Sequence, residues 1–413
     1  MPPLYDHQSR FLARNPNKAI ISHEAGTGKT RIACEWMKVR ADKKAIVVCT
    51  KATKQKWIDD LVKWEVEHDV LVVTKEEFKS WGYNEKRDVI VIDECHHFSS
   101  PLFVARARSQ LSEKLYNYIQ TQANCHILLM SANVIRSTPW NLHTLAVYAG
   151  QYIDWRKYQD RFFELVRRPY LPRPAWQPRK GWQKEMQKLI PRYCDVAIMS
   201  DCTDVPIHQY ELVGISLKDD TKQKMRSIEQ EEWEAMKVWT EQHRLENGKE
   251  KLEYIKELGE RNKKIVVVCH YREQLDIYEK ELAKQKQVFV LHGGVKDQST
   301  PIREAQEAEE CYLLVQASMG AGFDLDRFSI MVFASMSFKY VDHSQMLGRI
   351  NSIHNLHRNR YIYLIGGDKD KAIYDTIKRN EDFDPTKYLT KKAKQERGKD
   401  NRSSDGLVQE KLL

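Results

Sequence analysis

The sequence predicts an α/β protein with two lobes, each a mostly parallel sheet covered by helices. Two series of short apolar runs support this prediction, because the stretches between the runs have helical periodicity. Strands that alternate with helices in this way form parallel sheets. The runs are almost continuously apolar, as expected for strands that are covered on both faces. The length of 413 residues favours two or three domains.

The predicted strands are divided between the two halves of the chain, and amphipathic helices are expected at 31–39 and 55–64. The N-terminal series is Ala19–Ser22, Ala45–Cys49, Val70–Val73, Val89–Ile92 and Ile127–Met130. The C-terminal series is Ile265–Cys269, Val288–Leu291, Tyr312–Val315, Ile330–Phe333 and Tyr361–Ile365.

We expect an N-terminal lobe over residues 1–203 and a C-terminal lobe over 204–389. Residues 151–193 are rich in Trp, Tyr, Arg and Pro, and residues 217–262 read as charged, amphipathic helices packed on the second lobe. Residues 390–413 are polar and begin with basic residues, so we predict a disordered tail.

The composition indicates a soluble globular protein, with 41% hydrophobic and 30% charged residues. The net charge of +9 favours a polyanionic partner, although this is supporting evidence only. No apolar run approaches the roughly 18 residues that span a bilayer, so we expect no membrane partner. None of the eight cysteines forms a C-x-x-C pair, which argues against a zinc ribbon or a disulfide scaffold and favours the reducing cytoplasm.

A glycine turn between a predicted strand and a predicted helix indicates a phosphate-binding loop. Gly26 and Gly28 allow backbone N–H groups to approach phosphates closely. Lys29 would neutralise the β and γ phosphates, and Thr30 would offer its hydroxyl to Mg²⁺. His23 occupies the position of the first glycine in the full pattern, so the match is incomplete.

Two adjacent carboxylates, Asp93 and Glu94, follow the apolar run Val89–Ile92. The carboxyl end of a strand in an open α/β sheet is where ligands bind. Asp93 would hold Mg²⁺, and Glu94 would orient or deprotonate the attacking water. The alternative is a capping pair at a helix start, which the phosphate loop upstream makes less attractive. The compact run 95–97 cannot by itself close a tetrahedral metal site.

The order of these blocks resembles a superfamily 2 helicase or translocase of the DExH type. The matching blocks are Tyr5–Gln8 for the adenine-reading element, 24–30 for motif I, 47–57 for Ia, 93–96 for II, 131–133 for III, 266–270 for IV, 314–325 for V and 345–349 for VI. The stretch after Ser131 resembles the Swi/Snf-like branch, which also places a polar residue at the first loop glycine. The compact size is similar to bacteriophage or bacterial members.

The resemblance implies two RecA-like lobes with ATP and Mg²⁺ in the cleft between them. It implies a monomeric motor that moves 3′ to 5′ on forked, branched or duplex DNA, in the bacterial or host cytoplasm. The implied catalytic residues are Lys29, Asp93, Glu94 and Arg349, with Thr30 and Asp93 on Mg²⁺. The implied nucleotide contacts are Gln8, Glu24, Ala25, Gly26, Thr27, Gly28, Lys29, Thr30, Gly322 and Asp324. For Asp324, a helix cap or turn aspartate is an equal alternative.

Nucleic-acid contacts should be to the backbone, because a motor must move along any sequence. The candidates are Thr50, Lys51, Thr74, Lys75, His270, Ser318, Gln345, Arg173 and Arg179. For the loop positions among them, an ordinary polar residue is the alternative. The segment 167–182 combines positive charge with aromatic rings, which suits stacking on unpaired bases or wedging at a fork. The alternative is a strap that packs its tryptophans on the first lobe.

One position departs from the family pattern: Ser352 stands where motif VI has a second arginine. Such an arginine contributes a factor of about 10³ or more to turnover. Either Arg349 is sufficient, or Arg358 or Arg360 substitutes, or Ser352 replaces an original arginine. Two alternative functions stay open beside the DNA motor. One is a double-stranded-RNA-dependent ATPase, because the Asp-Glu-Cys-His box also occurs in RNA-sensing helicases, and the other is an ATP-gated binding protein with impaired hydrolysis.

Overall fold

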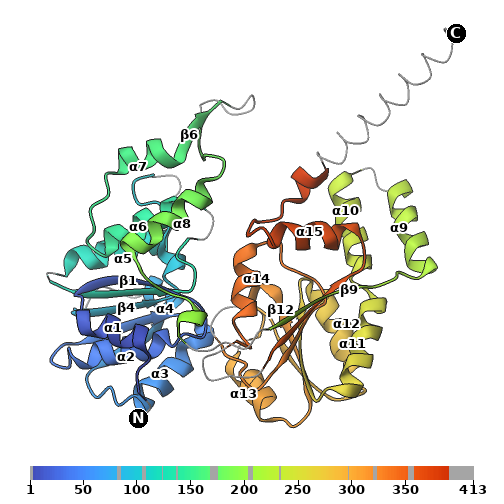
Figure 1. Cartoon of the computed structure of the whole chain (residues 1–413), viewed down its shortest axis with the longest axis horizontal. Helices are drawn as coiled ribbons and strands as arrows, with labels where there is room; N and C mark the ends of the chain where they lie inside the picture. The colour runs from blue at the N-terminus through green and yellow to red at the C-terminus, as the bar shows by residue number, and fades with distance from the viewer. Residues whose placement is uncertain are drawn as a thin grey trace, which may run out of the picture. The chain divides into compact units, whose positions relative to one another are not determined.

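The structure is a computed structural model in which residues 3–80, 85–104, 108–122, 124–135, 138–167, 175–202, 208–231, 234–295, 297–319, 323–351 and 358–389 are described. It divides into two compact units (Figure 1). The first unit contains Met1–Ile207 with two later segments, Ala321–Asp326 and Gly348–His357. The second contains His208–Gly320, Arg327–Leu347 and Arg358–Leu413. The predicted tail at 390–413 lies outside the described residues.

The first unit is built on a six-stranded sheet in the order β3-β2-β4-β5-β1-β8. Every neighbouring pair is parallel, as predicted. The strands are β1 Lys18–His23, β2 Ala45–Cys49, β3 Val70–Thr74, β4 Val89–Asp93, β5 His126–Ser131 and β8 Asp195–Ala197. The five predicted strands are all present. Strand β8 was not predicted, because its three residues contain no apolar run.

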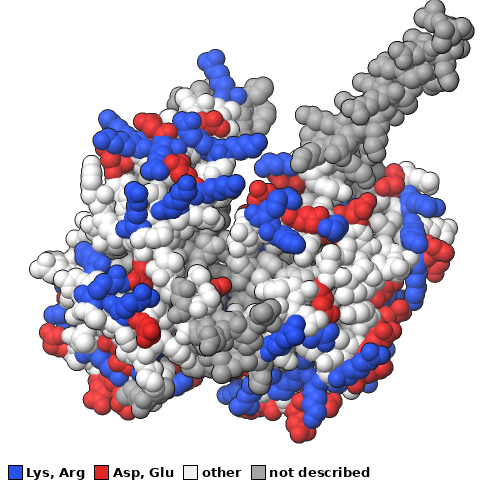
Figure 2. Space-filling view, in the orientation of Figure 1, with Lys and Arg blue, Asp and Glu red and all other residues white. Residues whose placement is uncertain are grey.

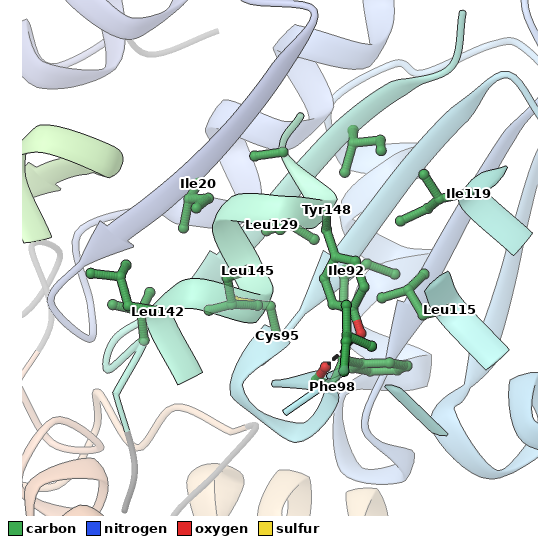
Figure 3. Packing of buried hydrophobic residues seen from close by; sticks show 14 of the residues in the cluster. Ile20, Ile92, Cys95, Phe98, Leu115, Ile119, Leu129, Leu142, Leu145 and Tyr148 are labelled. Carbon is green, nitrogen blue, oxygen red and sulfur yellow. Dashed lines mark hydrogen bonds between the residues drawn. The ribbon is translucent and has the colours of Figure 1, made fainter. Parts of the chain in front are cut away.

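Successive residues of a strand point to opposite faces, and both faces of this sheet are buried. Ile46 and Val48 of β2 join one hydrophobic core, whereas Val47 and Cys49 join the other. Tyr148 belongs to the first core, and its hydroxyl donates to the carbonyl oxygen of Phe98 at 2.9 Å (Figure 3). The same hydroxyl lies 2.9 Å from the carbonyl oxygen of Ser112. This two-sided burial explains why the strands read as continuous apolar runs.

Helices cover the first sheet, and two of them match the predicted amphipathic stretches. The helices are α1 Asp6–Arg14, α2 Lys29–Lys38, α3 Lys54–Lys63, α4 Lys75–Ser80, α5 Gln110–Thr121, α6 Trp140–Tyr148, α7 Trp155–Phe162 and α8 Trp182–Tyr193. The Trp- and Arg-rich segment 151–193 supplies α7, α8 and an antiparallel pair of strands, β6 Phe163–Val166 and β7 Ala175–Pro178.

The second unit repeats the architecture, with parallel strands in the order β11-β12-β10-β13-β14-β9. The strands are β9 Gln209–Gly214, β10 Lys264–Cys269, β11 Gln287–Leu291, β12 Cys311–Gln316, β13 Ile330–Phe333 and β14 Arg360–Ile365. The five predicted strands are again present. Strand β9 was not predicted, because it alternates polar and apolar residues and leaves Tyr210 and Leu212 exposed.

The described residues of the charged stretch 217–262 lie mainly in three helices, α9 to α11. The helices of this unit are α9 Asp219–Glu231, α10 Ala235–Glu246, α11 Lys249–Arg261, α12 Arg272–Leu282, α13 Ser299–Glu307, α14 Tyr340–Leu347 and α15 Asp368–Ile377. Leu252 and Ile255 of α11 pack in the core with Ile265 and Tyr312 of the sheet. In the part of the chain that the structure describes, no helix combines the length and apolar character needed to cross a bilayer.

Candidate active site

The glycine turn lies between β1 and α2, which is the arrangement the sequence predicts. Gly26 and Gly28 have φ values of 81° and 79°, in the left-handed region that favours glycine. Helix α2 then begins at Lys29, so its first N–H groups and the positive end of its dipole lie beside the turn. This geometry is suited to binding a phosphate group.

The Lys29 ammonium lies inside this turn. Its Nζ donates to the carbonyl oxygens of His23 and Glu24, both at 2.9 Å. Burial lowers the pKa of Lys29, and the nearby carboxylates of Glu94 and Asp93 oppose that shift. A phosphate in the turn would therefore meet the Lys29 ammonium, which is hydrogen-bonded to backbone carbonyls and influenced by the charges of Glu94 and Asp93.

Two residues of α1 brace the turn from its other side. His7 Nε2 is hydrogen-bonded to the carbonyl oxygen of Thr27 at 2.9 Å. Gln8 Nε2 donates to the carbonyl oxygens of Thr27 and Gly28 at 3.4 and 3.3 Å. The family resemblance implies that Gln8 reads adenine, and that role stays a prediction. The bond from His7 was not predicted, because nothing in the sequence pairs this ring with Thr27.

His23, at the position of the missing glycine, connects two strands. Its ring is hydrogen-bonded to Asp195 of β8, and Asp195 also pairs with Arg14. Burial lowers the pKa of His23, and the bond to Asp195 opposes that shift. Glu24 accepts a hydrogen bond at 2.7 Å from the backbone N–H of Met199. These bonds join the phosphate loop to β8 and the turn after it.

The two predicted acidic residues follow one another at the end of β4. Asp93 Oδ2 accepts a hydrogen bond from Trp57 Nε1 at 2.9 Å, and Oδ1 accepts from the backbone N–H of Glu94 at 3.0 Å. Burial and the charge of Glu94 raise the pKa of Asp93. Glu94 has a φ of 49°, an uncommon conformation that costs on the order of 1–3 kcal/mol and often occurs at functional sites.

Glu94 is held by His96 and Ser131, which come from motifs II and III. Ser131 Oγ donates to Glu94 Oε2 at 3.2 Å, and His96 Nδ1 lies 3.0 Å from Ser131 Oγ and 3.3 Å from Glu94 Oε2. Burial alone would raise the pKa of Glu94. The bond from His96 and the charges of Lys29 and Arg349 outweigh burial, so the pKa is lowered overall. Glu94 is therefore an oriented, ionised carboxylate.

Arg349 belongs by its contacts to the first unit, together with Ala321–Asp326. Its Nη1 donates to the carbonyl oxygen of Phe323 at 2.7 Å and lies 3.9 Å from Asp324 Oδ1. Asp324 also pairs with Lys56, a partner that the sequence did not indicate. Burial would raise the pKa of Asp324, but Lys56 and Arg349 lower it overall.

The residues of this site suit a magnesium nucleotide. Mg²⁺ prefers oxygen ligands, and the predicted ligands Thr30 and Asp93 offer a hydroxyl and a carboxylate. The bonds from Trp57 and from the N–H of Glu94 fix the orientation of that carboxylate. Gly322 and Ser352 lie outside the described residues, as does Arg173 among the nucleic-acid candidates.

The candidate nucleic-acid contacts of the first unit lie at strand ends. Thr50 follows β2 and is hydrogen-bonded to Thr53 at 3.0 Å. Thr74 ends β3, and its hydroxyl accepts from the N–H of Glu77 at 3.1 Å. The other two candidates at these ends are Lys51, which is exposed, and Lys75, which is half-buried. The threonines stabilise the turns after their strands, and both lysines are accessible to a phosphate backbone.

In the second unit, His270 follows β10 and its ring packs on Phe338, with 4.5 Å between centroids. Burial lowers the pKa of His270 to about 4, which makes it a neutral ring at physiological pH. Ser318 lies in the short helix Ala317–Met319 and is exposed, whereas Gln345 of α14 is buried. Arg360, one proposed substitute arginine, pairs with Glu211 at 2.8 Å.

One buried group in the second unit has the composition of a metal site. His243, Glu246 and Asp370 offer ligand atoms within 4.8 Å of one another. Lys251 Nζ lies 2.6 Å from Asp370 Oδ2, and His243 Nε2 lies 3.0 Å from Oδ1. A cation already neutralises the carboxylate, so we interpret the group as a buried ion-pair network.

Comparisons with known proteins agree with this fold. Residues 250–354 match the family model of the helicase conserved C-terminal domain. S. cerevisiae Dbp5 bound to RNA and ADP BeF3 is similar at a TM-score of 0.54 and 11% identity, over 91% of this chain and 87% of that chain. A single-residue variant of Dbp5 in the same complex gives a TM-score of 0.55 with the same identity and coverage.

No curated protein matches the chain. The two sheets have the RecA-like fold of helicase lobes, which confirms the predicted fold class. The match over residues 250–354 lies in the second unit and resembles a helicase C-terminal domain, and the likeness to the Dbp5 structures shows the fold.

Proposed function

We propose that this protein is an ATP-dependent helicase or translocase that hydrolyses ATP to move along DNA. The observation that carries the proposal is one cluster of charges. Lys29 lies within electrostatic reach of Glu94, Asp93, Arg349 and Asp324. A cationic phosphate loop beside an acidic pair and an arginine is the set of groups that phosphoryl transfer needs.

Each group has a distinct part in the proposed reaction. Lys29 and the N–H groups at the start of α2 bind the β and γ phosphates. Mg²⁺, when bound, would neutralise charge on those phosphates, and Thr30 and Asp93 would hold it. Glu94 orients the attacking water and accepts its proton, because Ser131 and His96 fix one carboxylate oxygen.

Arg349 would stabilise the negative charge that develops on the transferred phosphate. Its bond to the Phe323 carbonyl oxygen occupies Nη1 and fixes the orientation of the guanidinium. A single arginine, with Ser352 at the second motif VI position, is consistent with slow turnover. We therefore keep an ATP-gated binding protein with impaired hydrolysis as a less active form of the same proposal.

DNA is proposed as the substrate because the stretch after Ser131 resembles the Swi/Snf-like branch. A bacterial or bacteriophage origin stays a prediction. Double-stranded RNA is the second candidate, because the Asp-Glu-Cys-His box also occurs in RNA-sensing helicases. Both similar Dbp5 structures are bound to RNA, which supports an RNA partner in general. The net charge of +9 suits either polyanion.

A phosphate-release assay tests the proposal. Wild-type protein should release phosphate from ATP, and duplex or forked DNA should stimulate release more than duplex RNA. Glu94→Gln should abolish release while ATP binding persists, because only the base is lost. The motor is rejected if wild-type protein releases no phosphate with any nucleic acid. Tight ATP-dependent binding to nucleic acid in that case would identify the gated binding protein.

A further inference from the structure

The paired strands β6 and β7 present an apolar face that is buried at one end and exposed at the other. Phe163 and Leu165 are two residues apart on β6, so they lie on the same face. Phe163 is 3% exposed and its ring stacks on Trp140, with 4.7 Å between centroids. Leu165 is 55% exposed, and its partner across the strands, Trp176, is 47% exposed. The apolar face is therefore buried at Phe163 and exposed at Leu165 and Trp176.

The position of the β6–β7 pair also separates Leu165 and Trp176 from the hydrophobic core. In Figure 1, α7 and β6 lie beyond α6 and α8, on the side of those helices away from the sheet. Trp182 of α8 packs against the hydrophobic core, but Trp176 and Leu165 do not belong to it. The strap interpretation therefore fits Trp182, whereas nothing in the core explains an apolar pair at Leu165 and Trp176.

Exposed basic residues are frequent on the elements next to β6 and β7 in the chain. Figure 2 shows Lys and Arg gathered over α7 and α8. Within the described residues 155–167 and 175–188 there are eight exposed basic residues and three acidic ones, Asp160, Glu164 and Glu185. The basic residues are Arg156, Lys157, Arg161, Arg167, Arg179, Lys180, Lys184 and Lys188. An exposed aromatic ring inside a basic surface is the composition that binds unpaired nucleic-acid strands.

We propose that Trp176 stacks on an unpaired base at a duplex junction, with Leu165 supporting the ring and the surrounding basic residues binding the phosphate backbone. This inference rests on the proposed function, because it assigns to the motor the element that holds separated strands. Stacking on a base is insensitive to sequence, since every base has a π face. The same face would therefore serve a DNA or an RNA junction.

Forked DNA and forked RNA carrying 2-aminopurine at the first unpaired position provide the test. Binding of wild-type protein should quench this fluorescence, because the base stacks on the indole. Trp176→Ala should remove the quench and weaken fork binding at least about fivefold, the low end for losing one stacked base. Trp176→Phe should restore most of both, since it keeps an aromatic face.

Tyr152→Ala is the matched control, because Tyr152 is 88% exposed on the same unit and lies outside the β6–β7 pair. It should leave the quench and the affinity unchanged. Circular dichroism and basal ATP hydrolysis should be the same in all three variants. The inference is overturned if Trp176→Ala quenches and binds as wild type does, or if Tyr152→Ala is equally damaging.

A second readout separates this inference from the proposed function. If the wild-type protein hydrolyses ATP, the Trp176→Ala variant should unwind a forked duplex more slowly than wild type. Its nucleic-acid-stimulated ATP hydrolysis should stay within about twofold of the wild-type rate. If wild-type protein quenches at the junction but never hydrolyses ATP, the motor fails and the stacking site stands. If wild-type protein hydrolyses ATP and the Trp176→Ala variant unwinds forks as fast as wild type, the stacking site fails and the motor stands.

Discussion

The indole N–H of Trp57 donates a hydrogen bond to Oδ2 of Asp93 at 2.9 Å, so a buried tryptophan of α3 orients the carboxylate proposed to bind Mg²⁺. A group that fixes a metal ligand through a hydrogen bond typically contributes 10–100-fold to metal affinity or activity. Trp57 is therefore a positioning residue for this site, which acts through Asp93.

We expect Trp57→Phe to raise the Mg²⁺ concentration needed for half-maximal ATP hydrolysis about tenfold, because an aromatic ring is kept and only the hydrogen-bond donor to Asp93 is lost. A Mg²⁺ titration of the steady-state rate measures this. Trp36→Phe is the control: Trp36 lies in the same core and loses a comparable bond to the carbonyl oxygen of Pro16. An equal effect of both substitutions on Mg²⁺ dependence would show that the bond to Asp93 has no specific role.

Restoring the second motif VI arginine should raise turnover. Ser352→Arg is expected to increase the rate of ATP hydrolysis, by up to about 10³-fold if the serine replaced an arginine finger. Steady-state phosphate release measures the change, with Ser352→Ala as a control that should leave the rate unchanged. An unaltered rate in Ser352→Arg would mean that Arg349 is sufficient or that another arginine substitutes.

Loss of Lys251 should destabilise the second unit. Its ammonium is completely buried and bonds to Asp370, Asn247 and the carbonyl oxygen of Ala334. Lys251→Met leaves the Asp370 carboxylate without its main cation, a change that costs about 3–5 kcal/mol. Urea unfolding of the variant measures the loss. The double variant with Lys251→Met and Asp370→Asn should recover part of the lost stability. If the two single substitutions destabilise additively, the Lys251 and Asp370 side chains are not coupled.

Acid should destabilise the second unit through His343. Burial lowers its pKa from 6.5 to about 4 in the folded chain. Between these values the unfolded chain binds a proton that the folded chain resists, so stability is full above pH 6.5 and falls as the pH drops toward 4. The contribution is at most about 3 kcal/mol.

His343→Phe should make the free energy of unfolding less dependent on pH between 7 and 4, because the titrating ring is removed while an aromatic ring still packs against Phe333 and Tyr363. Urea unfolding at pH 7.5 and pH 5 compares the two proteins. A variant that loses as much stability on acidification as the wild type would show that His343 does not titrate in this range.

Local residue patterns are enough to identify the strands and the phosphate loop. Runs such as Ala45–Cys49 are buried on both faces, so hydrophobicity alone marks them. Gly26 and Gly28 are required by backbone conformations that other residues rarely adopt, which makes the turn readable from residue type. The acidic pair was readable because it directly follows a buried strand.

Packing between distant segments brings the side chains of the site together. Trp57 reaches Asp93 across 36 positions, and His23 reaches Asp195 across 172. Nothing in the local sequence encodes such pairs, because they depend on how α3 packs against the sheet and on the register of β1 with β8. Strands β8 and β9 are also tertiary products: one is too short and the other too polar to be recognised, and each forms by pairing with the edge of an existing sheet.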